Sequence, residues 1–294
     1  MKRIGVIGGS GLYEMEGVQN LTEVRVETPF GEPSDAVLVG DLDGHPVAFL
    51  PRHGRGHRYN PSEINYRANI WALKSLGVDF ILSISAVGSM REEIEPGQLV
   101  LVDQFIDRTR GHRAHTFFDG GCVAHVAFGQ PICMDLLGLI QKAAESINAV
   151  HHVGGTYVCI EGPQFSTRAE SLMYRTWDVS VIGMTNLTEA KLAREAEISY
   201  ATIAMATDYD VWHDGEEDVT VEQVVATLRG NVDKAKALIR ATVPRIHNAR
   251  ANGLVTSSHN ALRNAVMTHP GKIPAQSRER VALFMDRYWN GDSK

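Results

Sequence analysis

Short apolar runs alternate along the chain with segments of helical periodicity. The apolar runs lie at residues 3–7, 36–39, 46–50, 80–86, 99–105, 155–160, 179–184 and 199–206. Some are almost continuously apolar, which is typical of central strands covered on both faces. Helical patterns lie between and after them, at residues 62–76, 133–148, 167–176, 186–196 and 219–246. Strands that alternate with helices in this way indicate the α/β fold class.

The composition of the chain changes after about residue 248. A stretch rich in Asn, Ser and Gly follows, which we expect to be a linker, and then two short amphipathic helices around Pro270. We therefore predict a single α/β domain over residues 1–248. A C-terminal helical extension over residues 249–294 should pack on a neighbouring element or subunit.

Composition and charge are those of an ordinary acidic globular protein. Of the 294 residues, 22% are charged, and the formal net charge is −6. No long run of Lys or Arg is present, so we expect no nucleic-acid surface. No apolar stretch reaches the roughly 20 residues of a membrane span, and the first residues lack a signal-peptide core. With three irregularly spaced cysteines, these features predict a cytoplasmic protein that does not contact a membrane.

A glycine turn directly follows the first predicted strand and contains Gly8, Gly9, Ser10 and Gly11. Backbone amides in such a turn can approach an anion closely, and the Ser10 hydroxyl adds a donor. The spacing does not fit the dinucleotide pattern G-x-G-x-x-G. The turn is either an anion contact or a tight connection.

Basic residues gather where the strand at 46–50 ends. Arg52, His53, Arg55 and His57 follow it, separated by glycines. An arginine fork and a titratable histidine suit phosphate binding. A zinc site at His53 and His57 is an alternative, but no Cys or acidic ligand lies nearby and the arginines would repel a metal, so we expect none. A solvated basic loop is the other alternative.

Small residues end the strand at 80–86, where Ser85 and Ala86 precede Gly88. Such residues at the carboxyl end of a strand often line a ligand crevice in α/β sheets. The pattern is not the nucleophile elbow G-x-S-x-G, which disfavours an acyl-transfer hydrolase. An ordinary strand terminus explains the segment equally well.

An aromatic residue follows a Gly-Pro turn at residues 162–163. Phe165 could stack on a planar base there, with Ser166 next to it, although a single Phe is more often part of a core.

Two acids follow the apolar strand at 199–206. Asp208 and Asp210 are two residues apart, so their side chains start on the same side if the strand continues. Paired acids can bind a metal, cap a helix or perform acid–base work.

Taken together and in this order, these segments resemble the 5′-methylthioadenosine phosphorylase branch of the trimeric purine nucleoside phosphorylase family. The resemblance covers about residues 3–246 and includes close matches at residues 28–35, 65–73, 103–109, 168–171 and 204–212. It implies a phosphorylase fold with a central twisted mixed β-sheet flanked by helices. It also implies a homotrimer, or trimers paired as a hexamer, and purine and methionine salvage.

The resemblance assigns roles to individual residues. Phosphate would be held by Ser10, Arg52, His53, Ser85, the backbone of Ala86, and Thr185. Ribose would lie over Met184, and adenine would meet Phe165, Ser166, Asp208 and Asp210. The methylthio end would contact Val221, Val225 and His57, with His125 reaching in from a neighbouring subunit. Inorganic phosphate would be a co-substrate, and neither a cofactor nor a metal is expected.

The chemistry of phosphorolysis fits these residue types. Glycosidic cleavage builds positive charge on the ribose ring and negative charge on the departing purine. Phosphate would stabilise the first, and a protonated Asp208 would assist the second at N7. Asp210 would raise the pKa of Asp208 and bind the 6-amino group.

The sequence departs from the family pattern at three places. Asn186 begins a tripeptide, Asn-Leu-Thr, where relatives usually show Thr-Val-Pro. Gly183 stands where the eukaryotic enzymes have Asn, and Gln164 stands where many relatives have Arg. A phosphorylase for 6-oxopurines is the alternative within the family, although such enzymes place Asn where this chain has Asp. From another class, a nucleotide-binding module or dehydrogenase would leave Asp208 and Arg52 with structural roles only.

Overall fold

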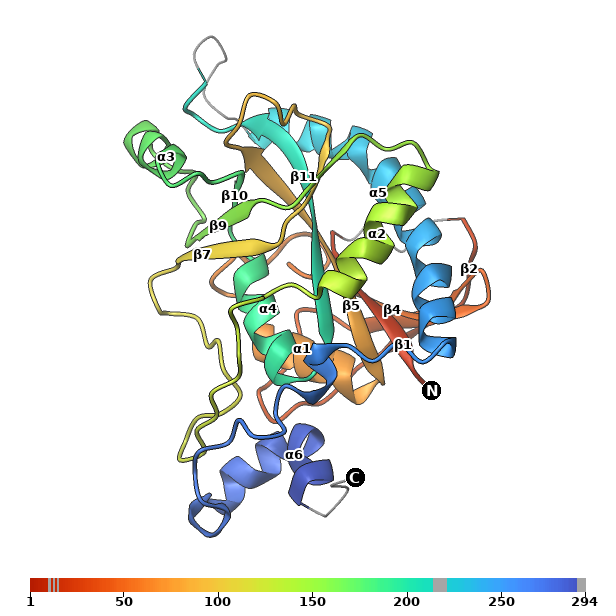
Figure 1. Ribbon diagram of the computed structural model, residues 1–294, viewed down its shortest axis with the longest axis vertical. Coiled ribbons are helices and arrows are strands. Elements are labelled where there is room, and N and C mark those ends of the chain that lie inside the picture. Colours follow the sequence, from red (N-terminus) through yellow and green to blue (C-terminus); the bar gives the residue numbers. More distant parts are fainter. Residues whose placement is uncertain (10–11, 13, 15, 214–220, 290–294) are drawn as a thin grey trace.

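The computed structural model of the chain describes residues 1–9, 12, 14, 16–213 and 221–289, except for the side chains of residues 221–226, 228 and 229. It shows an α/β architecture (Figure 1). The strands are β1 (Arg3–Gly8), β2 (Val18–Val24), β3 (Val37–Leu42), β4 (His45–Pro51), β5 (Val78–Ser89), β6 (Leu99–Leu101), β7 (Gln104–Arg108), β8 (His151–Val153), β9 (Thr156–Ile160), β10 (Val181–Gly183) and β11 (Ser199–Tyr209). The helices are α1 (Tyr66–Ser75), α2 (Met134–Ser146), α3 (Arg168–Arg175), α4 (Asn186–Glu195), α5 (Val221–Ala251) and α6 (Ala275–Trp289).

Within the described residues, the strands form one mixed sheet of 11 strands, which confirms the predicted architecture. The main path runs β2-β3-β4-β1-β5-β10-β9-β7, and β11 branches from β5 to reach β6 and β8. β1 pairs in parallel with β4 and β5, and β11 pairs in parallel with β5. The carboxyl ends of these central strands therefore meet at one edge, where a ligand crevice is expected.

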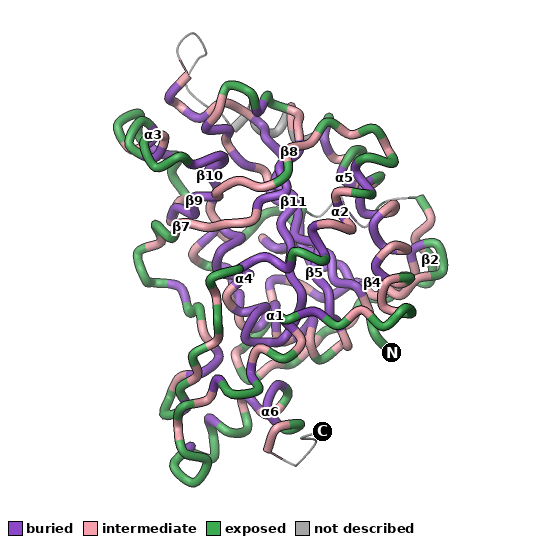
Figure 2. Tube along the Cα trace, in the orientation of Figure 1, coloured by how far each residue is buried: buried purple, intermediate pink, exposed green. Residues whose placement is uncertain are grey.

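Helices cover the centre of the sheet and bury it. α1 packs against α4 and α2 packs against α5, and in Figure 1 the two pairs lie on either side of β11. β5 and β11 are buried along most of their length, whereas α3 stands at the periphery and is largely exposed (Figure 2). Among the described residues, no helix is long and apolar enough to cross a membrane.

The strand predicted at residues 99–105 is two strands. β6 pairs with β11 and β8, whereas β7 pairs with β9, so the chain changes neighbours between them. Asp103 stabilises the crossing, because its backbone N–H donates to Gly155 O (3.2 Å) and its Oδ1 accepts from Gly155 N (3.1 Å). The short strand β8 was not predicted, because three residues give too little periodicity to recognise.

The C-terminal segment packs on the body of the same chain. Leu262, Val281 and Phe284 belong to the main hydrophobic cluster, and the rings of Phe284 and Phe117 lie 4.6 Å apart. Residue 248, where the composition changes, lies inside α5. The expected linker is wrong in part, because residues 257–260 form a 3-10 helix and Thr256 is buried.

Candidate functional site

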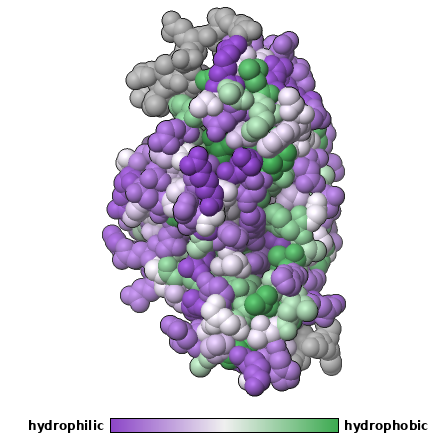
Figure 3. All heavy atoms as spheres, turned by 90° about the vertical axis from the view of Figure 1, so that its left-hand side faces the viewer, coloured by the Kyte–Doolittle hydropathy of each residue, from purple (hydrophilic) through white to green (hydrophobic). Residues whose placement is uncertain are grey.

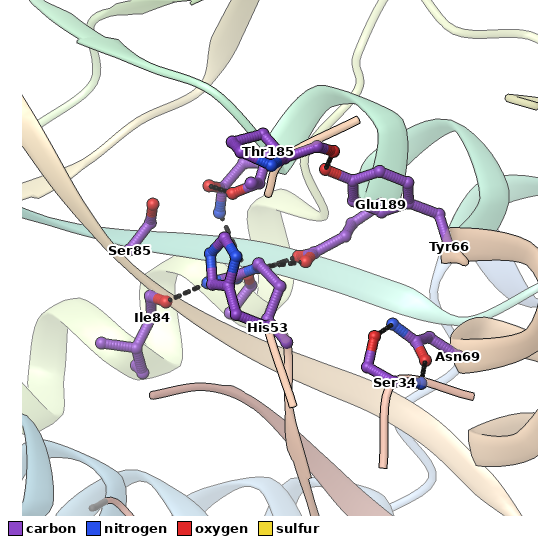
Figure 4. Close-up of polar contacts among 12 residues, drawn as sticks. Ser34, His53, Tyr66, Asn69, Ile84, Ser85, Thr185 and Glu189 are labelled. Atoms are coloured by element: carbon purple, nitrogen blue, oxygen red, sulfur yellow. Dashed lines mark hydrogen bonds and ion pairs between the residues drawn. The ribbon is translucent and has the colours of Figure 1, made fainter. Parts of the chain in front are cut away.

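Polar side chains from three segments meet at the carboxyl end of β5. Arg52 and His53 follow β4, Ser85 lies on β5, and Thr185 immediately precedes α4. Figure 4 shows Ser85, His53 and Thr185 around one space, with Ile84 and Glu189 beside it. Arg52, Ser85 and Thr185 are all buried, so the sheet and helices hold these groups in a largely water-free setting.

The Arg52 guanidinium is held by the protein on almost every side. It forms a two-point ion pair with Glu189, in which Nε donates to Oε1 and Nη2 lies 3.2 Å from Oε2. Nη2 also donates to Ser83 Oγ (2.6 Å) and Nη1 donates to Ile84 O (2.9 Å). A guanidinium has five N–H donors, and these contacts with described residues use four, which leaves one N–H on Nη1 that can donate to a ligand.

Burial alone would lower the pKa of Arg52, but the charge and hydrogen bonds of Glu189 raise it above its ordinary value. The guanidinium is therefore a permanent positive charge in the site. The α4 backbone adds to this charge, because the helix begins at Asn186 and its N-terminal end carries partial positive charge. An anion at this place would be stabilised by both.

The hydrogen bonds of His53 fix its tautomer. Its Nδ1 lies 2.8 Å from Tyr59 O, and because a carbonyl only accepts, Nδ1 carries the proton. Burial, together with the positive charge of Arg52, lowers the pKa of His53 to about 4. The ring is therefore neutral at pH 7, and Nε2 presents a lone pair rather than the donor that the sequence suggested. The exposed His57 ring stacks on it with centroids 4.1 Å apart.

The two acids lie together, although not through regular strand geometry. The pairing of β11 with β5 shifts at Thr207, so that Asp208 lies opposite Gly88. A Cβ added to Gly88 would lie 3.1 Å from Asp208 Oδ2 and 3.3 Å from Asp210 Cβ. Both acids therefore lie next to the same glycine. The register shift is a β-bulge, which changes the direction of the side chains that follow it, as bulges often do beside active sites.

Hydrogen bonds hold each carboxylate in place. Thr207 Oγ1 donates to Asp208 Oδ1 (2.6 Å), and Ser166 Oγ donates to Asp210 Oδ2 (2.7 Å). The second contact joins two residues that the sequence analysis placed at the same base. Phe165, next to Ser166, is 43% exposed, so it is not a core residue.

Met184 is held close to the Gly162 turn. A Cβ on Gly162 would lie 2.5 Å from Met184 Sδ, and Gly162 has a φ of +69°, so only glycine fits there easily. The buried Arg113 joins the two segments, because Nη1 donates to Met184 O and Nη2 donates to Glu161 O (2.5 Å). Arg113 lies in a segment with no periodic pattern, so the sequence gives no signal for this role.

Glu189 and Asn186 were also given no role from the sequence. α4 is buried along most of its length, so a carboxylate within it needs a cation. That cation is Arg52, 137 residues away in the chain, and no local pattern in the sequence specifies the pairing.

Some predicted site residues are not tested by the geometry. Ser10 and the side chains of Val221 and Val225 lie outside the described residues. His125 is exposed, and its backbone N–H donates to Ala265 O (2.8 Å). Its expected role in the site involves a second subunit. Within the part of the chain that the structure describes, no group of three or more His, Cys, Asp or Glu could hold a metal ion.

A mixed α/β sheet whose central strands end in a buried cationic cradle, with paired acids on the neighbouring strand, is the architecture of a nucleoside-processing phosphorylase. A family model described as the phosphorylase superfamily matches residues 3–244, and this chain belongs to that family.

Curated relatives and solved structures are similar over most of their lengths. The S-methyl-5′-thioadenosine phosphorylase of Geobacter sulfurreducens is 56% identical over 97% of this chain and 98% of its own. The enzyme of the same name from Chloroflexus aurantiacus is 55% identical over 98% of both chains. A crystal structure of a methylthioadenosine phosphorylase from an antarctic soil metagenomic library has a TM-score of 0.90 and 45% identity, over 96% of this chain and 98% of its own.

A more distant solved structure contains a ligand. The Schistosoma mansoni methylthioadenosine phosphorylase in complex with adenine has a TM-score of 0.80 and 36% identity, over 83% of this chain and 92% of its own.

Proposed function

We propose that this protein is a pentosyltransferase that cleaves 5′-deoxy-5′-methylthioadenosine with phosphate, giving adenine and 5-methylthioribose 1-phosphate. The observation that carries the proposal is that Ser85 and Thr185 lie around one space (Figure 4), with Arg52 bonded to Ile84 O beside Ser85, while Asp208 pairs with Gly88 further along the same strand, β5. An anion receptor thus lies beside a carboxylate pair. The names of the curated relatives support the same reaction.

On the phosphate side, catalysis is positioning and electrostatic stabilisation. Arg52 contributes its remaining N–H and its charge, and the backbone of Ala86 and the hydroxyls of Ser85 and Ser10 complete the cradle. His53 Nε2 accepts a hydrogen bond from a P–OH group. As the glycosidic bond lengthens, the phosphate charge stabilises the cationic ribose ring above Met184 and a phosphate oxygen then bonds to C1′.

On the base side, the departing purine gains negative charge that a hydrogen bond at N7 must stabilise. Asp208 supplies this bond, and Asp210 with Ser166 fixes the 6-amino edge (2.7 Å between Ser166 Oγ and Asp210 Oδ2). Phe165 covers the base as a stacking surface.

The 5′ end of the substrate is completed by Val221, Val225 and His57, and by His125 of a neighbouring subunit in a homotrimer. Support for association comes from exposed apolar side chains on and around α3, namely Phe165, Leu172, Met173 and Trp177. Figure 3 shows apolar patches among polar residues on that side of the molecule. Such patches commonly mark protein contacts.

The reaction needs phosphate as co-substrate and neither a cofactor nor a metal. We place the enzyme in the cytoplasm, in the salvage of purine and methionine precursors. An absorbance assay for free adenine, run on methylthioadenosine with and without phosphate, tests the proposal. Release that requires phosphate supports it, and equal release in phosphate-free buffer contradicts it.

A further inference from the structure

The side chain of Asn186 lies at the centre of a buried hydrogen-bond network. Its Nδ2 lies 3.0 Å from Ser83 Oγ, 3.1 Å from Tyr200 Oη and 3.1 Å from Thr202 Oγ1. Its Oδ1 accepts from Thr185 Oγ1 (3.2 Å) on the other side. One amide therefore joins the hydroxyl of Thr185 to Ser83, which also contacts Arg52.

The orientation of this amide is determined by Glu189. Ser83 Oγ and Tyr200 Oη both donate to Glu189 Oε2, at 2.7 and 2.9 Å, so they offer only lone pairs to Asn186. Nδ2 must face them and Oδ1 must face the opposite way. The Arg52–Glu189 ion pair thus fixes which groups donate and which accept along the network, from Ser83 and Tyr200 through Asn186 to Thr185.

Tyr157, on β9, contacts the same side-chain oxygen, Asn186 Oδ1. Its Oη lies 3.2 Å from Asn186 Oδ1, and the side chain is fully buried. A Cβ at residue 183 would lie 2.0 Å from Tyr157 Oη, so the hydroxyl reaches Asn186 only because residue 183 is glycine. Burial also raises the pKa of Tyr157, which keeps the hydroxyl protonated as a donor.

We propose that Asn186 is a positioning residue for phosphate, oriented through Glu189 and supported at Oδ1 by Tyr157, which reaches it past Gly183. Without phosphate, Thr185 donates to Asn186 Oδ1. When phosphate binds, the Thr185 hydroxyl turns its proton to a phosphate oxygen, and Tyr157 continues to satisfy Oδ1. Asn186 Oδ1 therefore keeps a hydrogen-bond donor, so the reorientation of the Thr185 hydroxyl costs little free energy.

This inference rests on the proposed function. The structure joins Gly183 and Asn186 through one tyrosine hydroxyl. A merely structural network would affect the binding of both substrates alike. The proposed role affects phosphate alone.

The test compares Tyr157→Phe with a matched control, Tyr288→Phe. Tyr288 also donates to a buried carboxylate, Glu197 (2.6 Å), but lies in α6, away from the site in Figure 1. Tyr157→Phe should raise the KM for phosphate about 3- to 10-fold and leave the KM for the nucleoside unchanged. Tyr288→Phe should change neither. Asn186→Thr, whose single hydroxyl cannot bridge the network, should raise the phosphate KM at least as much.

Two readouts separate the possible failures. Inorganic phosphate alone should raise the Tm of the folded chain equally in wild type and Tyr288→Phe, and should raise it less in Tyr157→Phe. If wild-type turnover needs no phosphate, the proposed function fails. If it does need phosphate but Tyr157→Phe and Asn186→Thr keep the wild-type phosphate KM, or raise both KM values equally, the inference is overturned.

Discussion

The carboxylate of Glu189 forms a two-point ion pair with the guanidinium of Arg52, with side chains only 3% and 4% exposed. This pair joins the first turn of α4 to the loop after β4, and so fixes two walls of the candidate site. Buried ion pairs contribute little net stability, but removing one partner leaves a costly unpaired charge. We conclude that the pair serves mainly to orient Arg52.

Substitutions at Arg52 and Glu189 should therefore affect the stability of the fold and the catalytic activity differently. Arg52→Met alone leaves Glu189 buried and unpaired, and should destabilise the chain by about 3–5 kcal/mol. The double variant Arg52→Met/Glu189→Gln carries no buried charge and should recover much of that stability in urea unfolding. Its kcat/KM for phosphate should still be about 100-fold or more below wild type. Wild-type activity in a folded double variant would show that Arg52 does not act on phosphate.

The neutral His53 ring predicts discrimination between oxyanions. With the Nδ1 proton donated to Tyr59 O, Nε2 accepts from a P–OH group, which phosphate carries at pH 7.5 and sulfate does not. The inhibition constant of sulfate should exceed the phosphate KM by about 10-fold or more. A glutamine amide can donate as well as accept, so His53→Gln should narrow this gap. Equal affinity of the wild-type enzyme for both anions would refute the tautomer argument.

The acid pair predicts selectivity for the purine. A carboxylate opposite position 6 accepts from an amino group but faces the lone pairs of a 6-oxo group. Inosine should have a kcat/KM about 30- to 1,000-fold below that of adenosine, with methylthioadenosine the best substrate. Asp208, at N7, lies beside this Asp210 carboxylate. Asp208→Asn should lower the kcat/KM of adenine nucleosides and partly restore that of inosine, because an amide can donate to O6 or N7 as well as accept. A wild-type preference for inosine over adenosine would instead favour the 6-oxopurine alternative.

Glu195 predicts a pH-dependent stability. Burial raises its pKa to about 7 in the folded chain, although it accepts from Phe117 N (2.7 Å) and Thr116 Oγ1 (2.8 Å). The folded chain therefore keeps a proton that the unfolded chain releases from about pH 4.5 upward, and stability falls as the pH rises through 7. Glu195→Gln, whose amide can serve both partners, should raise the Tm relative to wild type at pH 8 and much less at pH 5. An equal shift at both values would contradict this titration.

Local motifs in the sequence predicted most of the elements and the residues at their ends. Runs such as that before Arg52 reveal a strand and its carboxyl end, and parallel strands bring such ends together. The resemblance assigned Ser85 and the two acids to one site, and the parallel pairing of β5 with β11 brings them to the same edge of the sheet.

Long-range partners could not be predicted in this way. The Arg52–Glu189 pair spans 137 residues, and no local pattern specifies it. The bulge at Thr207 and the tautomer of His53 depend on neighbours that only the folded chain brings together. The role of Asn186 could not be predicted for the same reason, because its five hydrogen-bond partners come from three strands, β5, β9 and β11, and from the residue before α4.

The identity of the sugar product tests the central claim most directly. Methylthioadenosine should be incubated with the enzyme and inorganic phosphate, and the reaction followed by 31P NMR alongside adenine release. The account predicts a new sugar 1-phosphate resonance that grows in step with adenine, with no adenine released when phosphate is omitted. Adenine release with an unchanged inorganic phosphate resonance would identify water as the nucleophile and contradict the account.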